Sequence, residues 1–275
     1  MAKKKDITYF GQLGNQPNNI LKVRIAVWGG ILFVVLCGIF FIRYGVHKMY
    51  TDNPSLTLRK IQTSNTAHYP YPLIIQMLSE MGVESGLKTL PQLPISIIRD
   101  RFYKEPLIKN VSIQLLFPDT MKLIIAERLP IAVLRCNPSY CIDEDGVILP
   151  IKKRANQNPL PTFIGIRSPE KLTPGESTND ANLLAAVNFL KQLSLRKEGM
   201  LYDINFIQID NSYRELRVVL NAREIFKQNA TILLPIPGMN AALNGLREIV
   251  RERMENHKTV SYIDMTVNKN IPVRK

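Results

Sequence analysis

The chain has 275 residues, of which 45% are hydrophobic and 21% are charged, a composition typical of folded domains that excludes a disordered chain. Its formal net charge of +13 does not indicate a nucleic-acid partner, because the basic residues form no long run and no ladder with aromatic residues. We therefore expect a protein of one or two folded domains that binds no nucleic acid.

Residues 25–42 are an uncharged run, IAVWGGILFVVLCGIFFI, between Arg24 and Arg43. As a helix rising about 1.5 Å per residue, this run nearly crosses the ~30 Å hydrocarbon layer of a membrane. A cleavable signal peptide is the alternative, but its apolar part is shorter and ends at a small-residue cleavage site, whereas this run continues into RYGVHKMY. The sequence predicts a single retained transmembrane helix.

The flanking charges predict the orientation of this helix. Residues 1–24 contain five basic side chains and Asp6, a net charge of +4 (5 − 1), and such positive flanks stay on the cytoplasmic side. We expect a cytoplasmic tail at 1–24, the transmembrane helix at 25–42 and a linker at 43–55 leading to an exported part. The exported part keeps +9 (13 − 4), which either attracts anionic lipid headgroups or an acidic wall polymer, or is dispersed over a solvated surface.

Residues 56–128 have the pattern of a small α+β domain. Two amphipathic helical patterns lie between one strand pattern and a pair of strands joined at Pro118-Asp119. We expect both helices to pack on one face of a three-stranded sheet. The predicted elements are a strand at 56–64, helices at 70–82 and 94–105, and strands at 108–118 and 120–128.

The remaining residues, 129–275, predict a mainly antiparallel β domain with two helices. Alternating apolar residues with turn signals indicate hairpins, and apolar stripes at helical spacing indicate the helices. The fold class of the whole chain is therefore α+β. The predicted elements are a hairpin at 130–151, helices at 180–193 and 240–254, a hairpin at 206–220 and a last strand at 259–267.

No combination of residues in the sequence indicates an enzyme. The three histidines, His47, His68 and His257, stand apart from one another and belong to no metal-binding or nucleophile-activating motif. Nucleotide-binding loops and the G-x-S-x-G nucleophile motif are also missing. We therefore predict no catalytic residue, no metal, no cofactor and no small-molecule substrate.

The segment IDEDGVI, residues 142–148, allows two interpretations. Its acidic residues resemble the start of a Ca²⁺ loop, but such a loop needs a distant oxygen ligand after the glycine, where this chain has VILPIKK. Asp145-Gly146 between two apolar runs is a strong signal for a tight turn. We expect the turn.

Cys136 and Cys141 are separated by the four residues NPSY. In a hairpin the two cysteines could form the first pair of facing residues in the two strands, with Cα atoms about 5.5 Å apart. Because disulfides persist outside the cytoplasm, a Cys136–Cys141 disulfide is one expectation, and two half-buried thiols in adjacent strands are the other. Cys37 lies in the predicted transmembrane helix and is interpreted as a packing residue.

The segment IKNVSIQLLFPDTMKLIIAERLPIAVL, residues 108–134, and the segment YCIDEDGVILP, residues 140–150, carry a family motif. Residues 106–150 resemble the FtsQ family of bacterial cell division proteins, called DivIB in Gram-positive bacteria. In that family a POTRA domain, a small α+β module, ends with P-x-V-x-x-A-x-V-x-R-x-x-P-x-T-L-x-I-x-V-x-E-R-x-P-V-A, and L-I-D-x-x-G-x-V follows. Two departures are Ser64-Asn65, where the family has Gly-Asn, and the closing YIDMTVNKNIPVRK, which lacks the arginine and glycine of I-D-x-R-x-x-x-G. The matching residues are Pro106, Ile108, Val111, Pro118, Thr120, Leu123, Glu127, Arg128, Pro130, Ala132, Ile142, Asp143, Gly146 and Val147.

The resemblance implies both a fold and a function. Residues 56–128 would be a POTRA domain and residues 129–275 a β domain, in a single-pass protein of the cell (inner) membrane at the division septum. The function implied is that of a non-enzymatic scaffold, which links small membrane-spanning partners of the FtsB and FtsL type to the septal wall synthase.

The last strand is the predicted partner site, because the resemblance implies that the C-terminal part of the β domain docks the FtsB partner. If this strand lies at the edge of its sheet, its unpaired backbone groups can accept a partner strand, with Tyr262 as the aromatic anchor. The alternative is an internal strand paired on both sides. The residues predicted to face the core are Ile263, Met265 and Val267, and the predicted partner-binding residues are Tyr262, Ile263, Asp264 and Thr266.

Two other functions remain open from the sequence. A POTRA module that assists the assembly of outer-membrane or secreted proteins would carry several POTRA units or a β-barrel, whose alternating segments do not follow residue 129. A membrane-anchored wall hydrolase or transferase would need a nucleophile and a base within reach of each other.

Overall fold

The computed structural model describes residues 18–151, 159–210, 212, 214–267 and 271–274. The predicted cytoplasmic tail lies outside the described residues up to residue 17. Contacts within the chain define two compact units, and each is described by itself. The first comprises Met1–Lys60, Ser85–Leu93 and Leu116–Thr120, and the second comprises Ile61–Glu84, Pro94–Leu115 and Met121–Lys275.

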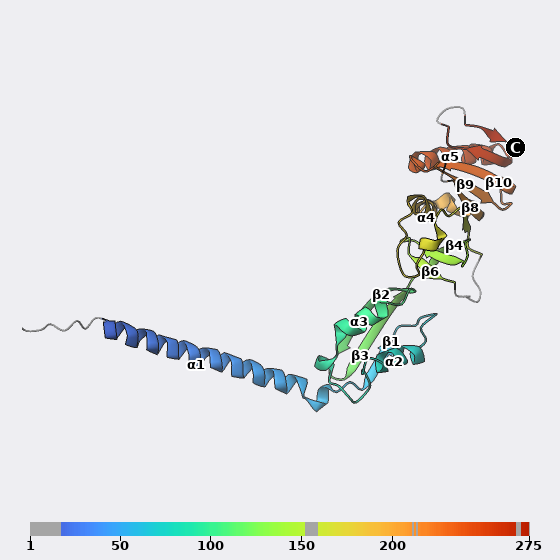
Figure 1. Cartoon of the computed structure of the whole chain (residues 1–275). Helices are drawn as coiled ribbons and strands as arrows, with labels where there is room; N and C mark the ends of the chain where they lie inside the picture. Colours follow the sequence, from blue (N-terminus) through green and yellow to red (C-terminus); the bar gives the residue numbers. More distant parts are fainter. Residues whose placement is uncertain (1–17, 152–158, 211, 213, 268–270, 275) are drawn as a thin grey trace, which may run out of the picture. The chain divides into compact units, whose positions relative to one another are not determined.

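Helix α1, Asn18–Thr51, contains the predicted membrane span (Figure 1). Its stretch Arg24–Thr51 has 28 residues and a mean hydropathy of 2.7, enough by length and composition to cross a membrane. The helix continues beyond the predicted span, so residues 43–51 of the expected linker are helical and not an open tether. It ends there because a following proline restricts Asn53 to extended conformations, and Asn53 has φ −73° and ψ 115°.

The first sheet has three strands in the order β1-β3-β2. With its two helices it has the predicted order strand, helix, helix, strand, strand. The first strand is shorter than expected, because a 3₁₀ turn, η1, Pro54–Leu56, takes up the start of the predicted segment. The elements are β1 Lys60–Thr63, α2 Tyr71–Ser79, η2 Leu90–Gln92, α3 Ile95–Tyr103, β2 Ile108–Leu116 and β3 Thr120–Glu127.

The second sheet has nine strands in the order β12-β11-β10-β9-β8-β7-β4-β5-β6. Five of its eight pairings are antiparallel, and β4–β7, β7–β8 and β10–β11 are parallel, which confirms the mainly antiparallel sheet with two helices. The elements are β4 Pro130–Leu134, β5 Tyr140–Asp143, β6 Ile148–Pro150, β7 Thr162–Ile164, η3 Pro169–Lys171, α4 Ala181–Ser194, η4 Lys197–Leu201, β8 Ile204–Asp210, β9 Glu215–Leu220, β10 Phe226–Pro235, α5 Met239–Glu255, β11 Val260–Asp264 and β12 Val273–Arg274.

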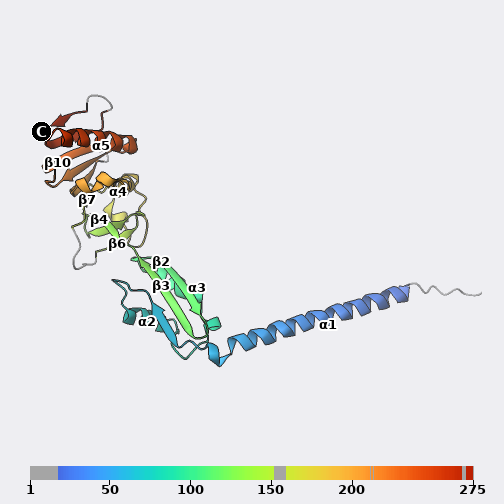
Figure 2. The same cartoon turned by 180° about the vertical axis from the view of Figure 1, so that it is seen from behind.

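A row of apolar residues crosses seven strands of the larger sheet and forms the middle of its core. Neighbours in this row are paired residues of adjacent strands, so their side chains point to the same face. Helices α4 and α5 bury their apolar faces in the same core, and Figures 1 and 2 show α5 lying along β10. The core row consists of Leu134, Phe163, Ile207, Val218, Ile232, Ile263 and Val273.

Three strands of this sheet were not predicted: β7, β10 and β12. In strand β10 the polar residues KQN follow the first residue, Phe226, and the register shifts there, where Asn229 takes a left-handed conformation with φ 61°. This bulge interrupts the alternation from which a strand is recognised. Strands β7 and β12 have only three and two residues, too few for a period to appear.

Candidate partner-binding surface

The face of the larger sheet opposite the core row carries the predicted partner-binding residues. Each of its residues precedes or follows a core-row residue in the strand, so its side chain points away from α4 and α5. We call this surface the outer face. One transverse row on it consists of Thr162, Phe206, Val219, Thr231, Tyr262 and Arg274, and a second consists of Ile164, Gln208, Arg217, Leu233 and Asp264.

Three of the four predicted residues are brought together at one end of the outer face. The guanidinium carbon of Arg274 lies 5.3 Å from the ring centroid of Tyr262, a cation–π arrangement. The hydroxyl of Tyr262 donates to Asp264 Oδ2 at 3.3 Å. The other oxygen of Asp264 accepts hydrogen bonds from the backbone N–H of Thr266 at 2.9 Å and from its hydroxyl at 2.6 Å. The sequence offered no sign that Arg274 belongs to this group.

The alternation predicted for the last strand is partly correct. Ile263 and Met265 are buried as expected, at 0% and 6% exposure, but Val267 is exposed and not part of the core. The inclusion of Ile263 among the partner contacts was wrong, because its side chain lies in the core row and offers no surface. Tyr262 and Asp264 are half-buried and Thr266 is exposed.

Carboxylates act on the ionisation of Tyr262 and Glu215 at this end of the sheet, where Arg274 and Arg217 oppose them. Burial, then the charge of Asp264 and its hydrogen bond, raise the pKa of Tyr262, so the hydroxyl stays protonated. Burial, then the charges of Asp210 and Asp264, also raise the pKa of Glu215, against the opposing effect of Arg217. Hydrogen-bond donors and cations are therefore the favoured groups next to these carboxylates.

The prediction that the last strand lies at the sheet edge was wrong. Strand β11 lies between β10 and β12. The sequence did not reveal these two neighbours because both carry the weak patterns described above. Within the part of the sheet that the structure describes, the outermost strand on this side is β12, only two residues long. A partner strand would therefore meet β12 first.

The register of β12 indicates which of its backbone groups point outward. The N–H of Asp264 donates to the carbonyl of Pro272 at 3.1 Å, and Tyr262 pairs with Arg274 two residues further along. Hydrogen-bonded and non-hydrogen-bonded pairs alternate in an antiparallel ladder, so the intervening pair, Ile263–Val273, makes no hydrogen bond across the ladder. The N–H and C=O of Val273 consequently point away from β11.

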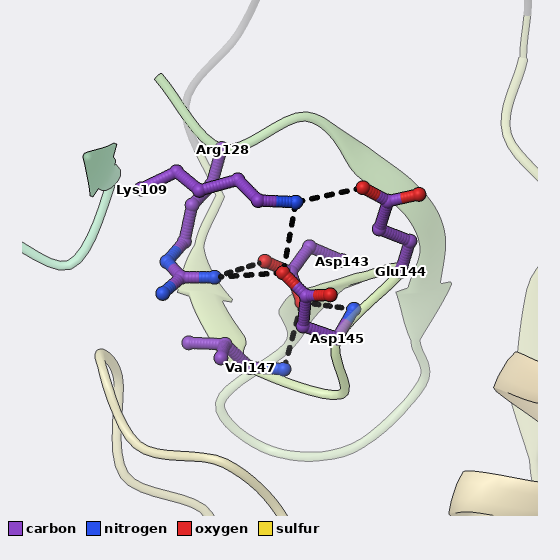
Figure 3. A network of polar contacts seen from close by, with 6 residues as sticks. All are labelled: Lys109, Arg128, Asp143, Glu144, Asp145 and Val147. Atoms are coloured by element: carbon purple, nitrogen blue, oxygen red, sulfur yellow. Dashed lines mark hydrogen bonds and ion pairs between the residues drawn. The ribbon is translucent and has the colours of Figure 1, made fainter. Parts of the chain in front are cut away.

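The acidic segment at residues 142–148 forms the predicted tight turn, which joins β5 to β6 (Figure 3). Asp143 is buried at 1% exposure, and its Oδ1 accepts the backbone N–H groups of Asp145 at 3.0 Å and Val147 at 2.8 Å. Its Oδ2 lies 2.6 Å from the Arg128 guanidinium, which follows strand β3. Gly146 closes the turn with φ 78°.

A lysine completes this network (Figure 3). Lys109 Nζ lies 2.7 Å from Glu144 and 2.9 Å from Asp145, and its hydrogen bonds lower the pKa of both carboxyl groups. Lys109 is in β2, so the network connects residues of the smaller sheet to the turn of the larger one. Since Arg128 and the turn N–H groups enclose Asp143, and Lys109 pairs with the exposed Glu144 and Asp145, the turn serves the structure.

Cys136 and Cys141 are free thiols in the structure. The hairpin pairs Cys141 with Val133 and Leu134 with Tyr140, which leaves Cys136 in the connecting loop. The predicted facing of the two cysteines is therefore wrong, and the disulfide is not formed. Burial raises the pKa of both thiols, which keeps them in their unreactive form.

The histidines do not come together either. The backbone N–H of His68 donates to Glu127 at 2.7 Å, and its ring Nδ1 lies 3.3 Å from the same carboxylate, so His68 fastens a loop to the end of β3. Among the described residues, no group of three or more His, Cys, Asp or Glu side chains could hold a metal ion.

Comparison with known proteins supports the resemblance over most of the chain. No family model matches. The chain is 23% identical over 256 residues to the cell division protein FtsQ of Geotalea daltonii, which covers 93% of this chain and 88% of the relative. It is 21% identical to FtsQ of Syntrophotalea carbinolica, over 90% of this chain and 84% of the relative.

A relative from a different group carries the other family name. The chain is 23% identical over 174 residues to the cell division protein DivIB of Clostridium acetobutylicum, which covers 62% of this chain and 66% of the relative. The agreement extends from the apolar helix through both sheets in the FtsQ relatives, so it concerns the architecture as well as the 106–150 motif. These similarities to proteins named FtsQ and DivIB support the FtsQ/DivIB family and a role in bacterial cell division.

Proposed function

We propose that the chain is a non-enzymatic scaffold of the division machinery, anchored by α1 and acting through exported POTRA and β domains at 56–128 and 129–275. Its partners are small membrane-spanning division proteins of the FtsB and FtsL type, together with the septal wall synthase. The division names of the relatives and the single apolar helix support this proposal.

The observation that carries the proposal is the end of the larger sheet at β12. A partner strand pairs with the outward N–H and C=O of Val273, while its side chains reach the outer face beside Tyr262 and Arg274. Tyrosine and arginine commonly dominate the energy of interfaces because they combine a large apolar area with directed hydrogen bonds. The backbone of β12 supplies the strand pairing, and the side chains of Tyr262 and Arg274 supply the specificity.

The test compares two substitutions at one position. Val273→Pro removes the outward N–H, whereas Val273→Ala shortens the same side chain but keeps the N–H. We expect Val273→Pro to weaken binding of the FtsB-type partner by about ten-fold relative to Val273→Ala, the effect of roughly one lost hydrogen bond. Binding is measured with the detergent-solubilised full-length chain, whose folding is checked by near-UV circular dichroism.

Equal affinities for two folded variants would place the docking site elsewhere. If Val273→Pro disturbs folding, Arg274→Ala provides the second test, because its exposed side chain contributes no core packing. An unchanged affinity in Arg274→Ala would then count against the outer face.

The orientation of α1 is part of the proposal. Positive residues before Arg24 keep the N-terminus in the cytoplasm, so a reporter fused after Lys275 is active only outside the cytoplasm. Activity of a cytoplasm-dependent reporter at the same position would refute an exported scaffold.

A further inference from the structure

Three segments of the first compact unit expose large apolar side chains close to the end of α1. They are the last turn of α1, the loop at 85–93 and the turn between β2 and β3 at 116–120. Isolated exposed apolar residues are ordinary, but a group gathered from three segments indicates a surface that is covered. We call this group the α1-end patch; its residues and exposures are Met49 81%, Tyr50 53%, Leu87 67%, Leu116 43% and Phe117 53%.

The three segments are fastened to one another. The rings of Tyr50 and Phe117 lie 6.2 Å apart between centroids. The hydroxyl of Thr89 donates to the carbonyl of Thr51 at 2.6 Å, which joins the loop to the helix end. The backbone at 58–59 connects loop and turn, since the carbonyl of Leu58 accepts from Gly86 and the N–H of Arg59 donates to Asp119, both at 2.8 Å. These contacts attach the patch to the end of α1 within the first unit.

The length of α1 beyond the apolar run determines what the patch can reach. The uncharged run ends at Ile42, and Thr51 follows nine residues later, about 13 Å at ~1.5 Å per residue. A headgroup layer fills about 5–7 Å of that height. A tilt of about 20°, average for such helices, lowers one side of the helix end by several ångströms, within the reach of an aromatic side chain.

The three segments of the patch carry a net positive charge, which favours contact with lipid headgroups. Residues 44–60, 85–93 and 116–120 contain four basic side chains, Lys48, Arg59, Lys60 and Lys88, against the two carboxylates of Asp52 and Asp119. Basic groups beside a membrane are attracted to lipid phosphates, and tyrosine favours the headgroup level because one end of its ring is apolar and the other polar.

We propose that the α1-end patch rests on the outer headgroup layer of the membrane and thereby sets the direction in which α1 tilts. The occupant of the patch is the lipid surface, because α1 brings the patch to it by direct continuity. The interaction goes beyond the scaffold function, and it requires only that α1 spans the membrane.

The experiment uses tryptophan as a depth probe in the full chain, reconstituted in lipid nanodiscs. Trp28 is the single tryptophan of the sequence, so Trp28→Phe combined with Phe117→Trp places one probe in the patch. We expect a nitroxide on the lipid headgroup to quench this probe, and its emission to lie to the blue of the same protein unfolded in urea. The native chain serves as the control, with Trp28 quenched by a nitroxide on the acyl chain.

A second pair of variants tests whether the apolar surface causes the contact. In the probe background, Leu87→Asp should reduce headgroup quenching at least about two-fold, since a charge at the interface opposes insertion. Met200→Asp, at an exposed apolar residue of the second unit, should leave the quenching unchanged.

The outcomes separate the patch from the span. A probe at position 117 that only a water-soluble quencher reaches, in a chain whose Trp28 is quenched by lipid, overturns the proposal. An unquenched Trp28 would instead contradict the membrane span on which the proposal rests. Equal quenching in Leu87→Asp and Met200→Asp also overturns it, because the contact would then not depend on the patch.

Discussion

Two aspartates near opposite ends of the larger sheet perform the same local task in different surroundings. Asp143 and Asp264 each use one carboxylate oxygen to accept hydrogen bonds from the residues that follow. The second oxygen of Asp143 contacts the Arg128 guanidinium at 2.6 Å, whereas that of Asp264 accepts from the half-buried Tyr262 at 3.3 Å. The first carboxylate is enclosed by protein groups, and the second remains beside a surface.

This difference separates a structural carboxylate from one available for recognition. A buried charge that loses its partner costs several kcal/mol, so the Asp143 network is fixed in one arrangement. A half-exposed carboxylate next to an aromatic ring and an arginine has the composition of an interface. Substitutions at the two sites should consequently affect different measurements.

Removing the enclosed carboxylate should give the largest change in stability. We expect Asp143→Ala to lower the free energy of unfolding by about 3–5 kcal/mol, because it leaves Arg128 without its buried partner and two turn N–H groups without an acceptor. Asp264→Ala is the matched control and should cost about 1 kcal/mol. Thermal unfolding of the solubilised chain measures both, and equal losses would erase the distinction.

Removing the aromatic ring beside the open carboxylate should affect binding. We expect Tyr262→Ala to weaken the affinity for the FtsB-type partner by about 30-fold, or ~2 kcal/mol, as for an interface hot spot. Thr231→Ala, in the paired position of β10 on the same row, should change the affinity less than about three-fold. Comparable losses in the two variants would mean that no anchor exists at Tyr262.

A third carboxylate, Glu127, makes a contribution to stability that depends on pH. Burial acts to raise its pKa, but hydrogen bonds from the His68 and Ala67 N–H groups outweigh burial and hold the pKa below the ordinary 4.5. The ionised form is thus favoured by folding, so its stabilisation is complete above pH 4.5 and is lost as the pH falls through the lowered value.

The corresponding variant is Glu127→Gln. It should cost about 1.5 kcal/mol at pH 7, because the charge-assisted hydrogen bonds are lost, and the cost should shrink on acidification below pH 4.5. Urea unfolding at pH 7 and at pH 3.5 provides the measurement. A cost that does not vary with pH would show that the ionisation of Glu127 contributes nothing.

The smallest effect is expected at the exposed side of the Asp143 network. Lys109 is 39% exposed, and its partner Glu144 is 49% exposed. We expect Lys109→Ala to change the free energy of unfolding by about 0.5 kcal/mol or less, since solvent screens such pairs. A loss approaching that of Asp143→Ala would mean that the whole network acts as one unit.

The sequence predicted the smaller sheet well because its signals are local. Each of its helices has an apolar stripe, with Ile74 and Leu78 buried in α2 and Ile98 and Phe102 in α3, and the Pro118-Asp119 pair marks the hairpin. The β5–β6 turn was equally clear, because Asp145-Gly146 supplies the left-handed glycine that the turn requires.

The sequence predicted that Tyr262, Asp264 and Thr266 point outward from the last strand, but not where that strand lies in the sheet. Partner binding by these residues stays a prediction. Tyr262, Asp264 and Thr266 stand together as expected, since the alternation of β11 places the first two on one face. Whether β11 lies at an edge depends on which strands flank it, a long-range property. The bulge at Asn229 in β10 and the two-residue length of β12 hid both neighbours, and with them the position of Arg274 beside Tyr262.

Photocrosslinking in dividing cells tests the central proposal most directly. A photoreactive amino acid replaces Thr231 or Arg274 on the outer face, or Glu252, an exposed residue of α5 on the opposite side of the sheet. We predict that the two outer-face positions capture the same division protein, identified by mass spectrometry, and that position 252 does not. Capture of that protein at position 252 with none at positions 231 and 274, in chains that still support division, would contradict the account.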